Sequence, residues 1–122
     1  MRIELPWPDA RLNPNRSKGR HWAAVHHVRG KARRDAWALT HQASRNGPSY
    51  EVGVPVPLRI TFVQPDRRQR DRDNLLAAMK PSLDGIADAL GINDYQFDPI
   101  TIRREYGAKP GAVIVEVGDV PL

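Results

Sequence analysis

The sequence lacks cysteine, and this absence excludes several kinds of chemistry at once. None of its 122 residues is cysteine, so disulfide bonds, thiolate catalysis, iron–sulfur clusters and cysteine-ligated zinc are excluded. A domain of this length buries a core without cross-links, and we therefore expect a reducing, cytoplasmic location. No stretch approaches the roughly 18 apolar residues of a membrane span. The first twelve residues lack the apolar core of a secretory signal.

Internal repeats, low-complexity tracts and linkers are also missing, so we expect one domain covering residues 1–122. Apolar periodicity predicts a strand over 1–7, a helix over 21–45, a strand over 54–63, a helix over 74–90, and strands over 99–106 and 112–118. This β-α-β-α-β-β order predicts an α/β (α+β) fold, a mixed sheet with helices packed on it.

Local signals refine the two predicted helices. Trp22 lies on the apolar stripe of the first helix, so core packing is predicted for it. Trp7 and Trp37 have two readings, packing or stacking on unpaired bases. In the second helix, Asp73 is expected as the N-cap. Pro81 predicts a kink or the start of another helix within 74–90.

Positive charge is concentrated in the first part of the chain. Residues 1–50 hold ten basic and three acidic side chains, a net charge of +7, whereas residues 51–122 carry −2. Within the first part, the loop after residue 8 contains four basic residues: Arg11, Arg16, Lys18 and Arg20. We expect this loop, and the stretch 11–34 around it, to attract a polyanion such as nucleic acid.

The segment 64–74 carries the strongest chemical signal. It follows a predicted strand and precedes a predicted helix, so rigid elements hold both of its ends. Asp71 and Asp73 are two residues apart, and Asp94 follows the helix, where the returning chain can bring it close to the pair. Three carboxylates at one point need a cation between them. Oxygen ligands without cysteine favour Mg²⁺ or Mn²⁺.

Such a metal site suits phosphodiester hydrolysis. The neighbouring cations fit phosphate binding: Arg67, Arg68, Arg70 and Arg72, with Lys80 further along the helix. The alternative is a solvated loop whose charges compensate one another, with Asp73 serving only as a helix cap. Asp84 and Asp88, one turn apart, form either another cation site or an exposed polar face.

Three segments together resemble the RusA-type Holliday-junction resolvases. They are Arg70-Asp71-Arg72-Asp73-Asn74-Leu75-Leu76, the helical Leu83-Asp84-Gly85-Ile86, and Asn93-Asp94-Tyr95-Gln96. The N-terminal Leu5-Pro6-x-Pro8 and Asn13-Pro14-Asn15 are similar to the Pro-rich strand and Asn-containing loop of that family. The resemblance extends from residue 5 to about residue 106.

The resemblance implies a homodimeric endonuclease that binds four-way DNA junctions in recombination and repair. It also implies that Asp71, Asp73 and Asp94 bind Mg²⁺ or Mn²⁺, while paired active sites cut two strands of like polarity. Two positions depart from the family. Ala77 stands where the family often has lysine, and Lys80 lies one helical turn later. Asn93 replaces the first residue of an acidic pair.

Two other functions remain open from the sequence. The departures at Ala77 and Asn93 favour a junction- or duplex-binding protein without catalysis, and a metal nuclease acting on RNA or flaps is the other alternative. The four histidines show no zinc-site spacing with an acidic partner, although His21 and His26 adjoin the basic loop. Arg103 and Arg104 either extend the DNA surface or face water.

Overall fold

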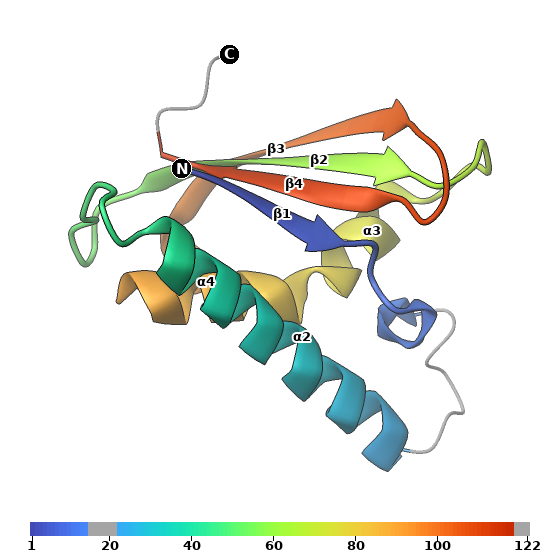
Figure 1. Cartoon of the computed structure of the whole chain (residues 1–122), viewed down its shortest axis with the longest axis horizontal. Coiled ribbons are helices and arrows are strands. Elements are labelled where there is room, and N and C mark those ends of the chain that lie inside the picture. The colour runs from blue at the N-terminus through green and yellow to red at the C-terminus, as the bar shows by residue number, and fades with distance from the viewer. Residues whose placement is uncertain (15–21, 119–122) are drawn as a thin grey trace.

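The computed structural model describes residues 1–14 and 22–118 (Figure 1). The elements are β1 (Arg2–Pro6), the 3₁₀ turn η1 (Ala10–Leu12), α2 (Trp22–Ala43), β2 (Val56–Gln64), α3 (Arg72–Ala78), α4 (Lys80–Leu90), the 3₁₀ turn η2 (Asp94–Gln96), β3 (Phe97–Tyr106) and β4 (Ala112–Val117). This is a small α+β fold, as predicted. None of the helices within the described ranges combines the length and apolar character that a bilayer span requires.

The four strands form one mixed sheet in the order β1-β4-β2-β3. β4 pairs antiparallel with both β1 and β2, whereas β2 and β3 run parallel. Parallel neighbours need a crossover connection, and here α3, α4 and η2 provide it. The three predicted metal ligands and the arginines at 67–72 therefore lie in the crossover between two adjacent strands.

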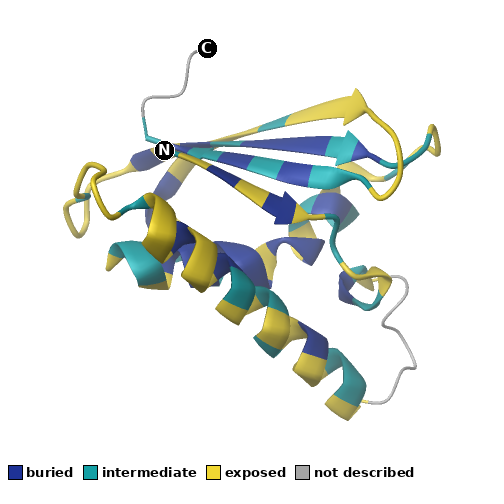
Figure 2. Ribbon diagram, in the orientation of Figure 1, coloured by how far each residue is buried: buried dark blue, intermediate teal, exposed yellow. Residues whose placement is uncertain are grey.

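The core lies between one face of the sheet and the helices. Alternate residues of the central strands point inward, among them Phe62 on β2 and Val115 on β4, both fully buried. Ile86 of α4 packs into the same cluster. Burial of each such side chain stabilises the fold by about 1.5 to 3 kcal/mol. Figure 2 shows buried residues along β2, β4 and α4, while the edge strand β3 is mostly exposed.

Helices α2 and α4 pack side by side under the sheet (Figure 1). Gly85 makes this close approach possible, because a Cβ at this position would overlap the carbonyl oxygen of Arg33. The Arg33 guanidinium also crosses to α4 and donates to Asp88 at 2.5 and 2.9 Å. α4 is thus fixed in position against both α2 and the sheet.

Two details of the helices refine or correct the sequence predictions. The helix predicted over 74–90 is two helices, and Pro81 lies in the first turn of the second, one of the two predicted outcomes. The prediction that Trp22 packs in the core is wrong. The residue is 75% exposed, and its ring stacks on His26 with ring centroids 4.8 Å apart. The reason is that the first turns of α2 extend past the end of α4 (Figure 1).

Candidate functional site

Asp71 and Asp73 lie at the start of α3, which follows the loop after β2. Asp71 is the N-cap, because its backbone is extended and its Oδ1 accepts a hydrogen bond from the N–H of Asp73 at 2.9 Å. A carboxylate there accepts a hydrogen bond from a free N–H group of the first turn and interacts favourably with the helix dipole. Asp73 lies within the first turn and is exposed. The prediction that Asp73 is the N-cap is therefore wrong, since the helix begins two residues earlier.

Asp94 folds back onto α4, where it meets Lys80 and Asp84. The Lys80 ammonium donates to Oδ1 of Asp84 at 3.0 Å and to Oδ2 of Asp94. Hydrogen bonds to Asp94 and then to Asp84 raise the pKa of Lys80. The same contact with Lys80 holds the pKa of Asp94 below its ordinary value. The Lys80 ammonium therefore lies between the carboxylates of Asp84 and Asp94.

The three predicted metal ligands have suitable chemistry, because carboxylate oxygens are the donors that Mg²⁺ and Mn²⁺ prefer. Their arrangement does not fit an ion: among residues 1–14 and 22–118, no group of three or more His, Asp or Glu side chains is placed to hold a metal. Asp71 follows the C-terminal end of β2, whereas Asp94 precedes β3. The first residue of β3, Phe97, pairs with Val56, the first residue of β2. The turn with Asp94 therefore joins the sheet at the end of β2 opposite to the end that Asp71 follows.

The turn that carries Asp94 is held by its neighbours. The Asn93 side chain caps η2 by accepting from the N–H of Tyr95 at 3.2 Å, and the side chain of Gln96 accepts from the N–H of Asn93 at 3.1 Å. The buried Gln96 amide also donates to the carbonyl oxygens of Glu51 and Val54 at 3.0 Å. Asparagine at position 93 thus has a structural use, because asparagine is a favourable N-cap.

Asp66 organises the arginine-rich loop between β2 and α3. Both of its carboxylate oxygens accept from the guanidinium of Arg70, at 2.8 and 3.2 Å, and Oδ1 also accepts from the N–H of Arg68 at 2.9 Å. The same guanidinium lies over the Trp7 ring, 5.2 Å from its centroid. Arg70 is therefore held in place, with a side chain only 20% exposed, whereas the side chain of Arg68 is 71% exposed.

The carboxyl group of Asp66 is expected to have a pKa well below that of an ordinary aspartate. Hydrogen bonds from Arg70 and then from Arg68 lower its pKa from 3.8 to about 2. The pKa of Asp66 is lower in the folded protein than in the unfolded chain. Its contribution to stability is therefore present at pH values above the unfolded pKa and is lost as the pH falls towards 2. A carboxyl NMR titration measures this directly. Arg70→Gln should return the pKa towards 3.8, and Arg67→Gln should leave it unchanged. An unshifted Asp66 in the wild-type protein contradicts the assignment.

Strand β3 adds a cation that the sequence left undecided. Arg104 donates to the carbonyl oxygen of Arg70 at 3.1 Å, and the guanidinium of Arg67 lies 5.3 Å from the ring centroid of Tyr106. Arg104 therefore joins the arginine-rich loop on the same side of the molecule. The sequence alone does not reveal this contact, because it depends on the parallel register of β2 and β3, in which Phe62 pairs with Arg104.

A pocket of about 260 Å³ brings together two segments that are distant in sequence. The N-terminal stretch contributes Trp7, Pro8, Asp9, Ala10 and Asn13, and the motif segment contributes Arg68, Arg70, Asn74, Leu75 and Ala78. Trp7 contacts Arg70 of the motif segment and packs its ring edge-on to Phe62 at a centroid distance of 6.1 Å. Both segments belong to the stretches singled out from the sequence, and the fold places them against each other.

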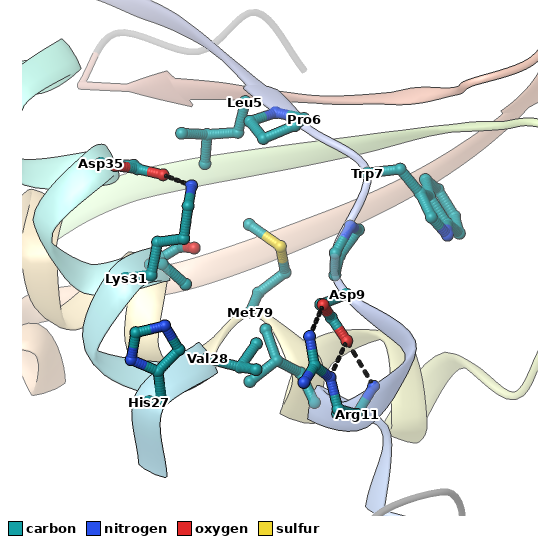
Figure 3. A pocket seen from close by; sticks show the side chains of 14 residues that line it. Leu5, Pro6, Trp7, Asp9, Arg11, His27, Val28, Lys31, Asp35 and Met79 are labelled. Atoms are coloured by element: carbon teal, nitrogen blue, oxygen red, sulfur yellow. Dashed lines mark hydrogen bonds and ion pairs between the residues drawn. The ribbon is translucent and has the colours of Figure 1, made fainter. Parts of the chain in front are cut away.

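A second pocket, of about 310 Å³, lies between α2 and the chain from β1 to η1 (Figure 3). The charged groups that line it are paired: Lys31 with Asp35 at 2.6 Å, and Arg11 with Asp9 at 2.8 Å. Figure 3 shows these pairs on opposite walls, with Met79 at the base. Of the predicted DNA-binding residues, Arg11 lines this pocket; none of the three predicted metal ligands does.

The structure describes only some of the residues that were predicted to contact DNA. Arg16, Lys18, Arg20 and His21 lie outside the described residues. Arg72 is exposed in the first turn of α3, close to Asp71 and Asp73 in the chain. Trp37 is 43% exposed and stacks on His41 with ring centroids 4.9 Å apart.

The chain is thus a small α+β protein. Its cluster of Lys80, Asp84 and Asp94 lies on the crossover between the parallel strands β2 and β3. No protein-family model matches the sequence. The chain is 36% identical over 115 residues to an uncharacterized protein of Xylella fastidiosa (strain Temecula1 / ATCC 700964), an alignment that covers 94% of this chain and 74% of that protein. The chain belongs to the same family as that protein.

Proposed function

We propose that the protein is a metal-dependent, structure-selective DNA endonuclease that resolves four-way junctions, as its resemblance to the RusA-type resolvases implies. The observation that carries the proposal is the pocket shared by the N-terminal stretch and the motif segment. Two of the stretches that resemble the family, about sixty residues apart, line this one pocket. The pocket adjoins the helix start that carries Asp71 and Asp73.

The charges around this pocket give the residues separate roles in the proposal. The exposed Arg68, Arg72 and Arg104 bind phosphates on either side of the scissile bond. Arg70 is tied to Asp66 and shapes the loop. The resemblance implies Asp71, Asp73 and Asp94 as the residues that would hold Mg²⁺ or Mn²⁺, whereas the structure pairs Asp94 with Lys80.

A homodimer completes the proposal, since a two-fold protein presents two equivalent sites to a two-fold junction. Paired incisions then follow from symmetry. The basic stretch 11–34 supplies the contacts to junction arms, so affinity should fall steeply with increasing salt concentration.

Asp73→Asn is the variant that tests this assignment. We expect it to bind a four-way junction with unchanged affinity and to lose cleavage, because it removes one negative charge from the proposed ligand set and no contact to phosphate. Gel-shift titrations and strand cleavage on the same labelled junction measure both properties. Normal cutting by Asp73→Asn would show that the site assignment is wrong.

A junction- or duplex-binding protein without catalysis is the second candidate. It is favoured by Lys80, which already neutralises Asp94, and by the lack of any three-ligand metal group in the described ranges. The two candidates differ in their need for metal. A pure binder retains its affinity in EDTA and leaves every strand intact in Mg²⁺ or Mn²⁺.

A further inference from the structure

The three α-helices of the described ranges all lie on one face of the sheet (Figure 1). There their apolar side chains form the core with the inward-pointing residues of the strands. The opposite face, which we call the open face, carries the strand residues that alternate with those core residues. On it, the residues of the central strands β2 and β4 are mostly half-buried, while those of the edge strands β1 and β3 are exposed.

A row of four residues crosses the middle of the open face. The strand register places Glu4 of β1 beside Ile114 of β4, Ile114 beside Thr61 of β2, and Thr61 beside Arg103 of β3. In the part of the chain that the structure describes, neither Glu4 nor Arg103 has an ion-pair partner. The row thus has opposite, unpaired charges at its two ends and a less polar centre.

The rows on either side are balanced in charge as well. One row places Ala112 beside Val63, both half-buried. In the other, the guanidinium of Arg59 donates to Oε1 of Glu116 at 2.8 and 2.9 Å. The three rows together hold three basic and three acidic residues: Arg2, Arg59, Arg103, Glu4, Glu105 and Glu116. In a chain with a formal net charge of +5, a neutral face with an apolar centre favours a protein partner over nucleic acid.

Two-fold symmetry makes the charges of the central row complementary. In a face-to-face dimer whose axis runs parallel to the strands, between β4 and β2, strand β1 of one subunit lies across from β3 of the other. Glu4 then faces Arg103 of the partner subunit, and the symmetry repeats this pair. An axis perpendicular to the strands would instead set Glu4 against Glu4 and Arg103 against Arg103, which is repulsive. The charges therefore favour the parallel axis.

We propose that the open face binds a second copy of this chain about a two-fold axis parallel to the strands. The proposal deepens the proposed function, on whose homodimer it rests, by assigning the surface that forms the dimer. The half-buried side chains of β2 and β4 make the centre of the interface, and the pairs of Glu4 with Arg103 make its rim. This axis also keeps the pockets lined by Arg68 and Arg70, which follow β2, at the same end of the dimer. One junction can then contact both.

Charge reversal tests the interface by sedimentation velocity over a range of protein concentrations, in EDTA and without DNA. The wild type should form a dimer. Glu4→Arg and Arg103→Glu should each raise the dimer dissociation constant about ten-fold or more, because each sets like charges against one another twice. The double variant Glu4→Arg/Arg103→Glu exchanges the charges and should return the constant to within about three-fold of wild type. A monomeric wild type, or a double variant weaker than both single variants, would overturn the proposal.

Arg34→Glu is the matched control, because it reverses an exposed charge on α2, across the sheet from the open face. Its dissociation constant should stay within about two-fold of wild type. Weakening as large as that of Arg103→Glu would assign the effect to the net charge of the chain and overturn the proposal.

The association measurement needs no catalysis, so its failure differs from that of the proposed function. A dimer that responds to Glu4→Arg as expected, but binds junctions without cutting them, supports the interface and refutes the proposed function. Paired cutting by a protein whose dimer is insensitive to Glu4→Arg overturns the interface and leaves the proposed function standing.

Discussion

Replacing Gly85 with alanine is expected to lower the free energy of unfolding by about 3 kcal/mol. The added Cβ would overlap the backbone carbonyl of Arg33 and come within 3.2 Å of the Cβ of Ala36. Backbone cannot rotate away as a side chain can, so α2 and α4 must separate. Separation opens the contact between α4 and the sheet as well. Urea denaturation of the purified variant measures the loss.

Gly30→Ala is the control for Gly85→Ala. Gly30 lies in the middle of α2, where a Cβ would meet only the end of the flexible Arg34 side chain, at 3.1 Å. Alanine there should stabilise the helix by about 0.5 to 1 kcal/mol. If Gly85→Ala is as stable as the wild type, the close packing of α2 on α4 is wrong.

Asp71→Asn is expected to reduce junction cleavage about 1,000-fold, because a ligand charge is worth several kcal/mol in the transition state and each 1.4 kcal/mol is ten-fold in rate. Stability should change by less than about 0.5 kcal/mol, because asparagine caps a helix as well as aspartate does. The hydrogen bond from the N–H of Asp73 is retained. Cleavage rates and urea midpoints of the same preparation test both parts.

Asp71→Ala completes the comparison, because it removes the cap together with the charge. It should lose about 1 kcal/mol of stability in addition to the loss of cleavage. Normal cleavage by Asp71→Asn, with loss only in Asp71→Ala, would mean that Asp71 is a helix cap and nothing more.

Much of the fold could be predicted because its local patterns agree with its tertiary contacts. β1 alternates apolar and polar residues, β4 is a short run rich in valine, and Pro81 marks the start of α4. Trp22 was mispredicted because helical periodicity does not show how far a neighbouring helix extends. The start of α3 was placed too late because Asp71 and Asp73 are both good caps, and only the backbone distinguishes them.

The candidate site was less predictable than the fold. The spacing of Lys80 and Asp84 is visible in the sequence, but their pairing with Asp94 depends on where α4 ends and how η2 turns. The sequence predicts that Asp94 returns close to the pair Asp71 and Asp73, and in the structure its ion-pair partner is Lys80 of α4. The convergence of Asp71, Asp73 and Asp94 on one ion stays a prediction, since the described residues pair Asp94 with an ammonium.

The most direct test is cleavage of a labelled four-way DNA junction by the purified wild-type protein, with Mg²⁺ and with EDTA. The proposal predicts paired, symmetrical incisions in two strands of like polarity in Mg²⁺ and intact strands in EDTA. Tight junction binding without incision in either Mg²⁺ or Mn²⁺ would contradict it.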